Sequence, residues 1–89
     1  MERTVTVVPE AGLHARPAAQ FVEAAGEYDA TVTIQVVGGD RGPVAANSML
    51  AVTGLNVPSG TDVTLVAEGP DAEAALDALE EILTTPEKE

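Results

Sequence analysis

One short stretch of the sequence holds the residues best suited to chemistry: residues 12–19 read Gly-Leu-His-Ala-Arg-Pro-Ala-Ala. His14 is the only histidine of the chain, and it stands in a predicted turn directly before a helix that Pro17 helps to start. The free N–H groups of a helix N-terminus carry partial positive charge, which attracts anions and disfavours an imidazolium. We therefore expect His14 to be neutral and nucleophilic near neutral pH.

Arg16 adds a permanent cation two residues after His14. Its guanidinium has a forked pair of donors that can hold two oxygens of a phosphoryl group. A neutral imidazole that attacks phosphorus, beside donors that hold the resulting dianion, would form a phosphohistidine site. From the residues alone an ordinary surface histidine stays open as the alternative, because one His and one Arg make a weak motif.

Length and composition narrow the class of protein. A chain of 89 residues corresponds to a single domain, 1–89. The absence of cysteine excludes a disulfide scaffold, a cysteine-rich zinc site and thiol chemistry. A single histidine and the lack of an Asp-rich twelve-residue loop give no ligand cluster for zinc or calcium. We expect no metal and no cofactor.

Charge is the most unusual feature of the composition. Fifteen Asp and Glu against four Lys and Arg give a net charge of −11, which disfavours nucleic acid and anionic membranes as partners. A single lysine beside so many carboxylates resembles the cytoplasmic proteins of organisms that balance external salt with potassium, an ordinary acidic bacterial protein being the alternative. No bilayer-spanning stretch and no signal peptide is evident, so we expect a cytoplasmic protein.

Hydrophobic periodicity predicts a mixed fold. Four runs have the pattern of short strands: 4–7, 31–36, 43–46 and 62–67. Three stretches have helical spacing or caps: 16–26, 49–52 ending near Gly54, and a last helix starting at 69–71. The order β-α-β-β-α-β-α predicts a two-layer α+β sandwich, in which apolar helix stripes cover one face of a four-stranded sheet.

The same periodicity predicts the core. The expected inward residues are Val32, Ile34 and Val36, Val63, Leu65 and Ala67, Ala18, Phe21, Val22 and Ala25, and Ala72, Ala75, Leu76, Leu79, Ile82 and Leu83. Gln20, Glu23, Glu80 and Glu81 are expected to face solvent.

The segment around His14 resembles the active-site signature of the HPr family, the histidine-containing phosphocarriers of the phosphoenolpyruvate-dependent sugar phosphotransferase system. Residues 47–50 resemble the family's second helix and residues 67–69 the lead into its last helix, so the resemblance covers nearly the whole chain. It implies an open-faced sandwich with a four-stranded antiparallel sheet of order 1-4-2-3 and three helices on one face. Periodicity alone does not give this order, because a ferredoxin-like arrangement shares the first six elements.

The resemblance also implies a function. His14 would accept a phosphoryl group on Nδ1 from phosphorylated enzyme I and pass it to the IIA domain of a sugar permease, with Arg16 positioning the phosphate. The protein would then be a carrier and not an enzyme, and a carrier that docks on several partners in turn is expected to be a monomer. Two alternatives stay open for the acceptor: the phosphotransfer subunit of a dihydroxyacetone kinase, or a nitrogen-related regulatory branch. A third alternative is a regulatory paralogue that binds a transcription factor. The presence of His14 and Arg16 argues against this alternative.

Ser48 corresponds in this resemblance to the serine that a dedicated kinase phosphorylates in some members. An N-cap serine would place the phosphate at a helix N-terminus, which suits a dianion. The alternative is a plain N-cap, for which serine is favoured in any case. Asn47 also stands where many members carry a lysine.

The resemblance further implies a partner-docking patch formed by Met49, Leu50 and Thr53. Helical spacing gives the alternative that Leu50 and Val52 belong to the core. On the first helix this chain has Glu23 and Glu27, whereas family members commonly carry lysine near the active site. These carboxylates disfavour charge steering toward an acidic partner, and contact packing would have to replace such steering at molar salt.

Overall fold

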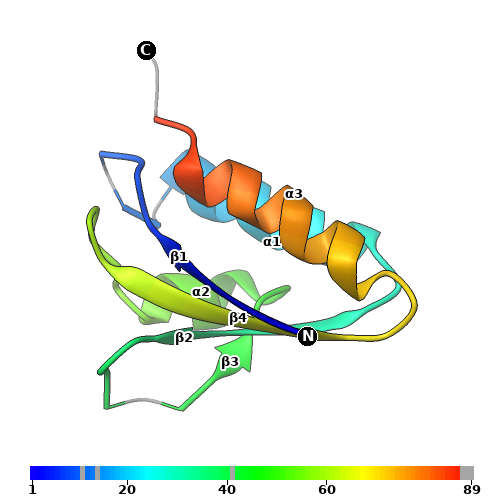
Figure 1. The fold of residues 1–89 in the computed structure, drawn as a ribbon. Coiled ribbons are helices and arrows are strands. Elements are labelled where there is room, and N and C mark those ends of the chain that lie inside the picture. Colours follow the sequence, from blue (N-terminus) through cyan, green and yellow to red (C-terminus); the bar gives the residue numbers. More distant parts are fainter. Residues whose placement is uncertain (11, 14, 41, 87–89) are drawn as a thin grey trace.

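The computed structural model describes residues 1–10, 12, 13, 15–40 and 42–86, and it contains every element that the periodicity predicts (Figure 1). The strands are β1 (Glu2–Thr6), β2 (Thr31–Val36), β3 (Val44–Ala45) and β4 (Asp62–Glu68), and the helices are α1 (Ala15–Glu27), α2 (Met49–Gly54) and α3 (Ala72–Thr84). The predicted order is confirmed, with element ends that differ from expectation by one or two residues.

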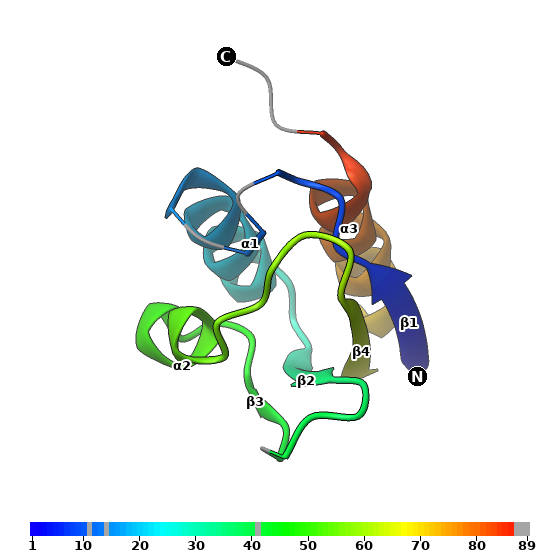
Figure 2. The ribbon, with the colours of Figure 1, turned by 90° about the vertical axis from the view of Figure 1, so that its left-hand side faces the viewer.

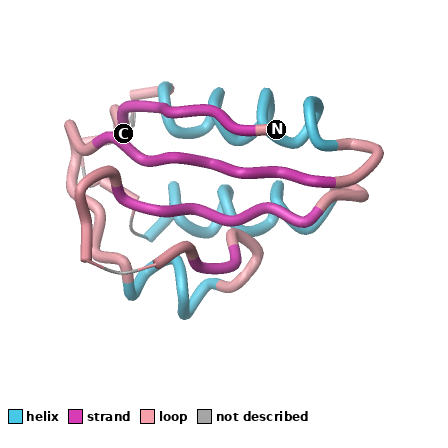
Figure 3. The backbone as a smooth tube through the Cα atoms, turned by 60° about the horizontal axis from the view of Figure 1, so that its bottom comes forward, coloured by secondary structure: helices cyan, strands magenta, loops and turns pink. Residues whose placement is uncertain are grey.

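The strands form one antiparallel sheet of order β1-β4-β2-β3, and all three helices lie on the same side of it (Figure 2). The central strand β4 pairs with both β1 and β2, as the matches of Leu65 with Arg3 and with Ile34 show. The two-residue strand β3 pairs with β2 alone within the described chain and ends the sheet (Figure 3). The order 1-4-2-3 is thus confirmed, and the ferredoxin-like alternative is wrong.

The core lies between the sheet and the helices, where the predicted apolar face of the strands packs against the predicted apolar stripes of the helices. Alternate residues of β4 are buried, and Phe21 of α1 and Leu76 of α3 are fully buried members of the same core cluster. Every residue predicted to face inward is buried except Val22, Val36 and Ile82, which are partly buried and pack against the core.

Two side chains depart from expectation. Leu50, one of the two α2 residues considered for the core, is 85% exposed, whereas Val52 is fully buried; a six-residue helix lying on the sheet can bury only one narrow face. Glu80 does not simply face solvent, because it is partly buried and accepts a hydrogen bond from Arg3 at 2.9 Å. Asp71 occupies the N-cap position of α3 without a side-chain capping hydrogen bond, and its carboxylate accepts from the N–H of Asp29 at 2.8 Å.

No helix within the described residues is both long enough and apolar enough to cross a membrane.

Candidate functional site

The predicted phosphoacceptor, His14, lies outside the described residues. The structure describes the residues on either side of it, Leu13 and Ala15. Leu13 is fully buried, and α1 begins at Ala15, one residue earlier than predicted. Pro17 falls in the first turn of α1, where its missing N–H leaves no helical hydrogen bond unmade. The chain therefore passes from a buried anchor through position 14 directly into a helix N-terminus.

The loop that leads to position 14 is fixed by backbone hydrogen bonds to two distant parts of the chain. The N–H of Val8 donates to the carbonyl of Leu83 in the last turn of α3 at 2.8 Å. The N–H of Leu13 donates to the carbonyl of Val57, in the loop after α2, at 2.9 Å. The local sequence supplies neither partner, so the course of this loop is a product of the tertiary fold.

Arg16 lies in the first turn of α1 with an exposed side chain. Among the described residues its side chain forms no ion pair or hydrogen bond, whereas the side chain of Arg3, the other described arginine, is held by Asp77 and Glu80. The guanidinium of Arg16 is thus available to an anion near the start of α1.

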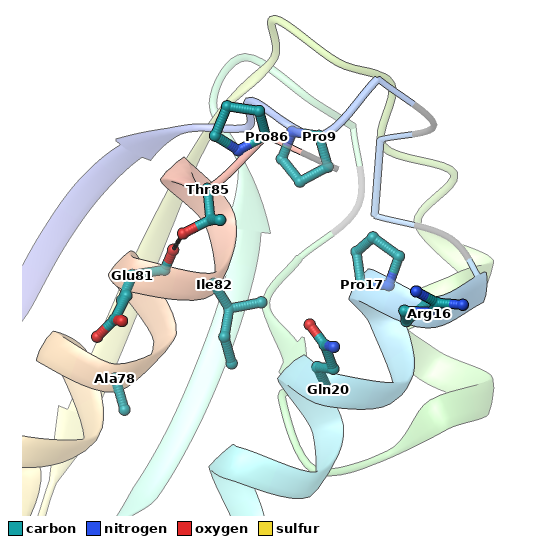
Figure 4. Close-up of a pocket in the computed structure, with 9 residues that line it drawn as sticks. All are labelled: Pro9, Arg16, Pro17, Gln20, Ala78, Glu81, Ile82, Thr85 and Pro86. Atoms are coloured by element: carbon teal, nitrogen blue, oxygen red, sulfur yellow. Dashed lines mark hydrogen bonds between the residues drawn. The ribbon is translucent and has the colours of Figure 1, made fainter. Parts of the chain in front are cut away.

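Arg16 also borders a cavity of about 510 Å³ between the start of α1 and the end of α3 (Figure 4). The walls come from three segments of the chain: Pro9, Arg16, Pro17, Gln20, Ala78, Glu81, Ile82, Thr85 and Pro86. Ile82 and Gln20 face one another across the gap between the two helices. Because Ile82 lines this cavity, it is only partly buried although it belongs to the apolar stripe of α3.

No sequence pattern predicts this cavity, because the residues that line it on α1 and on α3 are far apart along the chain and share no motif. Gln20 is exposed, as predicted, yet its place beside the cavity follows only from the packing of α1 on α3.

Ser48 is the N-cap of α2, as predicted. Its backbone is extended, with φ −111° and ψ 112°, and its Oγ accepts a hydrogen bond from the N–H of Ala51 at 3.3 Å. The side chain is partly buried. The plain N-cap role is therefore filled in this structure.

The predicted docking residues lie on α2, which packs beside α1 (Figure 2). Met49 is 41% exposed and Leu50 85% exposed, so two large apolar side chains face solvent next to each other at the start of α2. Thr53 is partly buried, and its hydroxyl donates to the carbonyl of Met49 at 2.8 Å. Residues 42–61, which contain α2, include no charged residue, although the whole chain carries nineteen. This face is therefore neutral on a strongly acidic protein.

A buried anchor, a helix N-terminus and a guanidinium that is unpaired among the described residues thus follow one another along residues 13–16. Such an arrangement suits an anion with several oxygens, because the N–H groups of a helix N-terminus and a forked cation both favour one.

The fold and this arrangement define the class of the protein, a small open-faced α+β sandwich of the phosphocarrier type. The family model described as "PTS HPr component phosphorylation site" matches residues 1–85, and the chain belongs to the HPr family.

Relatives at the level of whole chains agree with this assignment. A phosphocarrier protein HPr from Haloferax volcanii is 66% identical over 87 residues, which cover 98% of this chain and 97% of that protein. An HPr from Streptomyces coelicolor is 45% identical, covering 92% of this chain and 86% of that protein. Since Haloferax volcanii is a halophile, the first relative also supports the salt-adapted interpretation of the composition.

Among solved structures, the crystal structure of a phosphocarrier protein HPr from Bacillus anthracis matches with a TM-score of 0.86 and 36% identity. The match covers 93% of this chain and 95% of that one. The likeness thus extends over the whole sandwich and is not restricted to the segment around position 14.

Proposed function

We propose that His14 is the phosphoacceptor of this phosphocarrier, and that it takes the phosphoryl group from phosphorylated enzyme I, with phosphoenolpyruvate as the ultimate donor. The imidazole Nδ1 attacks phosphorus, a new N–P bond forms, and the bond between phosphorus and the donor breaks, with its electron pair left on the donor. The phosphoryl group then passes to the IIA domain of a sugar permease, which couples the carrier to sugar uptake and phosphorylation.

The observation that carries this proposal is the start of α1 at Ala15, directly after position 14. The N–H groups of the first helical turn favour a dianion there, and they disfavour a charged imidazole before transfer. The exposed guanidinium of Arg16, which has no partner in the described part of the chain, would hold two of the phosphoryl oxygens as the charge arrives.

Partner docking is assigned to the neutral face of α2, through Met49 and Leu50. Their exposed apolar side chains have no cover within the described chain, and exposed apolar patches on otherwise polar proteins mark interaction sites. We assign Thr53 to the rim of this surface. The carrier would act as a monomer in the cytoplasm, with residues 1–89 as one domain.

Ser48 is proposed as a secondary, regulatory phosphorylation site. Phosphorylation would replace the capping hydroxyl by a dianion beside Met49 and Leu50, and a charge on a neutral docking face opposes binding of an apolar partner.

The test of the main proposal uses the purified protein, phosphoenolpyruvate and a matching enzyme I. One acid-labile, base-stable phosphoryl group should be added per chain, and His14→Ala should abolish it while leaving the circular dichroism spectrum unchanged. Because the chain has one histidine and no cysteine, no other side chain of these kinds can take over. An acid-labile phosphate on the His14→Ala protein, or none on the wild type, would reject the proposal in favour of a non-catalytic regulator.

The acceptor is tested by mixing the phosphorylated protein with purified candidate acceptors in separate reactions. Transfer to a IIA domain supports the sugar-uptake role. Transfer only to the phosphotransfer subunit of a dihydroxyacetone kinase, or to a regulatory IIA protein, would assign the carrier to that branch.

A further inference from the structure

We propose that Gly12 is a positioning residue for phosphoryl transfer, because only a residue without a Cβ lets the chain before position 14 lie against the carbonyl of Val57. This inference rests on the proposed function of His14, and it adds a residue from outside the acceptor and its arginine.

Gly12 has no room for a side chain. It is buried, with φ +72°, and an added Cβ would meet the carbonyl oxygen of Val57 and lie 2.8 Å from the Cα of Pro58. Both obstacles are backbone atoms, which cannot rotate away as a side chain can. Any other residue at this position must therefore displace the 57–58 segment or the loop itself.

The atom that Gly12 approaches is also the one that holds the next residue. The carbonyl oxygen of Val57 accepts the hydrogen bond from the N–H of Leu13 at 2.9 Å. Leu13 and Val57 are both fully buried, so their side chains cannot shift without repacking the core. The contact at Gly12 thus sets where the chain leaves Leu13, and the residue that follows is His14.

A small displacement at this point matters for transfer more than for folding. In-line attack requires the imidazole at a defined distance and angle from phosphorus, and misplacement by about 1 Å can reduce rates by roughly a hundredfold. Met49 and Leu50 lie in the first turn of α2, whereas Val57 follows the end of that helix, so partner binding should depend on this contact less than transfer does.

The chain provides a matched control in Gly38. Its φ of +76° is nearly the same as that of Gly12, but an added Cβ there would meet no atom within 4 Å. Gly38→Ala therefore introduces the backbone strain of a left-handed alanine without the collision. A difference between the two variants measures the contact with Val57 and not the strain.

The experiment measures initial rates of phosphorylation by enzyme I and phosphoenolpyruvate, with each variant as the varied substrate and with rates corrected for the folded fraction. We expect Gly12→Ala to lower kcat by about tenfold or more with KM unchanged, and Gly38→Ala to change neither. The sole imidazole also gives an unambiguous NMR signal, which should shift in Gly12→Ala only. Equal rates and equal imidazole shifts for the two variants would overturn the proposal.

Pro58→Gly supplies a second variant, which adds no atom but frees the backbone that carries the Val57 carbonyl. It should lower kcat several-fold by itself. In the double variant with Gly12→Ala, the combined loss should be smaller than the product of the single losses, because the freed carbonyl can yield to the new Cβ. If the two losses in kcat simply multiply, the Val57 contact is not the cause and the proposal is overturned. If Gly12→Ala does not fold, the single variant Pro58→Gly decides, and an unchanged kcat in it overturns the proposal.

Failure of this inference can be told apart from failure of the proposed function. If the wild type accepts no phosphoryl group, the phosphocarrier proposal fails, and the imidazole shifts of the two glycine variants still decide whether Gly12 positions residue 14.

Discussion

Arg3 and Asp77 join the first strand to the last helix: Nη1 of Arg3 donates to Oδ1 of Asp77 at 2.6 Å. The same nitrogen reaches Oε1 of Glu80 at 2.9 Å, so one guanidinium serves two carboxylates one turn apart on α3. The hydrogen bond to Asp77 is the main cause that raises the pKa of Arg3, and burial acts in the opposite direction. One of the four Lys and Arg residues of the chain therefore links the edge strand β1 to α3.

Replacing Arg3 by Gln should lower the melting temperature by no more than a few degrees, because exposed ion pairs contribute little. The loss should be largest at low salt, where screening is weakest. Since the pKa of Arg3 is raised, its guanidinium stays charged below the unfolded-state pKa, and its contribution should not vary with pH around neutrality. Thermal melts of Arg3→Gln and wild type across salt and pH check this, and a loss that grows with salt would contradict it.

Stability of the wild type should increase with salt. At a net charge of −11 the folded chain repels itself, and added ions screen the repulsion between carboxylates that are brought together by folding. Thermal melts from low to molar potassium chloride provide the measurement. A melting temperature that is flat or falls with salt would reject the salt-adapted interpretation.

Arg16→Ala should slow transfer and leave the fold intact. The side chain is exposed and unpaired within the described residues, so its removal should change the free energy of unfolding by less than about 0.5 kcal/mol. Loss of a donor that holds developing charge should reduce the rate by roughly a hundredfold. Arg16→Lys should recover part of the rate, because it keeps the charge and loses the fork. Phosphorylation rates and melts of both variants decide, and a normal rate in Arg16→Ala would remove this residue from the site.

Leu50 and Val52 provide a matched pair on α2 that separates docking from packing. Leu50→Ala should raise KM for transfer with enzyme I and change stability by less than about 0.5 kcal/mol, since the side chain is 85% exposed. Val52→Ala should cost about 2 kcal/mol of stability and leave KM unchanged, because this side chain is fully buried. Urea unfolding and transfer kinetics of the two variants give both quantities. An unchanged KM in Leu50→Ala would place the docking surface elsewhere.

Ser48→Ala should cost about 1 kcal/mol of stability through loss of the N-cap. Ser48→Asp should keep the cap, since aspartate is an equally good N-cap residue, but should raise KM by placing a charge beside Leu50. Equal KM values for Ser48→Asp and wild type would argue against regulation through this position. Urea unfolding and the same transfer assay provide the measurements.

The elements and the core were open to sequence analysis because their signals are local. Alternation in residues 62–67 and the stripe of residues 72–83 report only which side of one strand or helix is apolar, and both were confirmed. The same reasoning failed at Leu50, because a helix of six residues is too short for its period to separate a buried from an exposed face.

The sequence by itself predicted the candidate site, since the resemblance of residues 12–18 to a phosphocarrier signature is local and needs no distant partner to be recognised. Only the tertiary structure decided which contacts hold that segment. The N–H of Leu13 bonds to the carbonyl of Val57, and the N–H of Val8 bonds to the carbonyl of Leu83. Both bonds form because the sheet order brings the loop after α2 and the end of α3 next to the segment that follows β1. These hydrogen bonds are accepted by backbone carbonyls, which every residue possesses, so the residue types at positions 57 and 83 do not predict them.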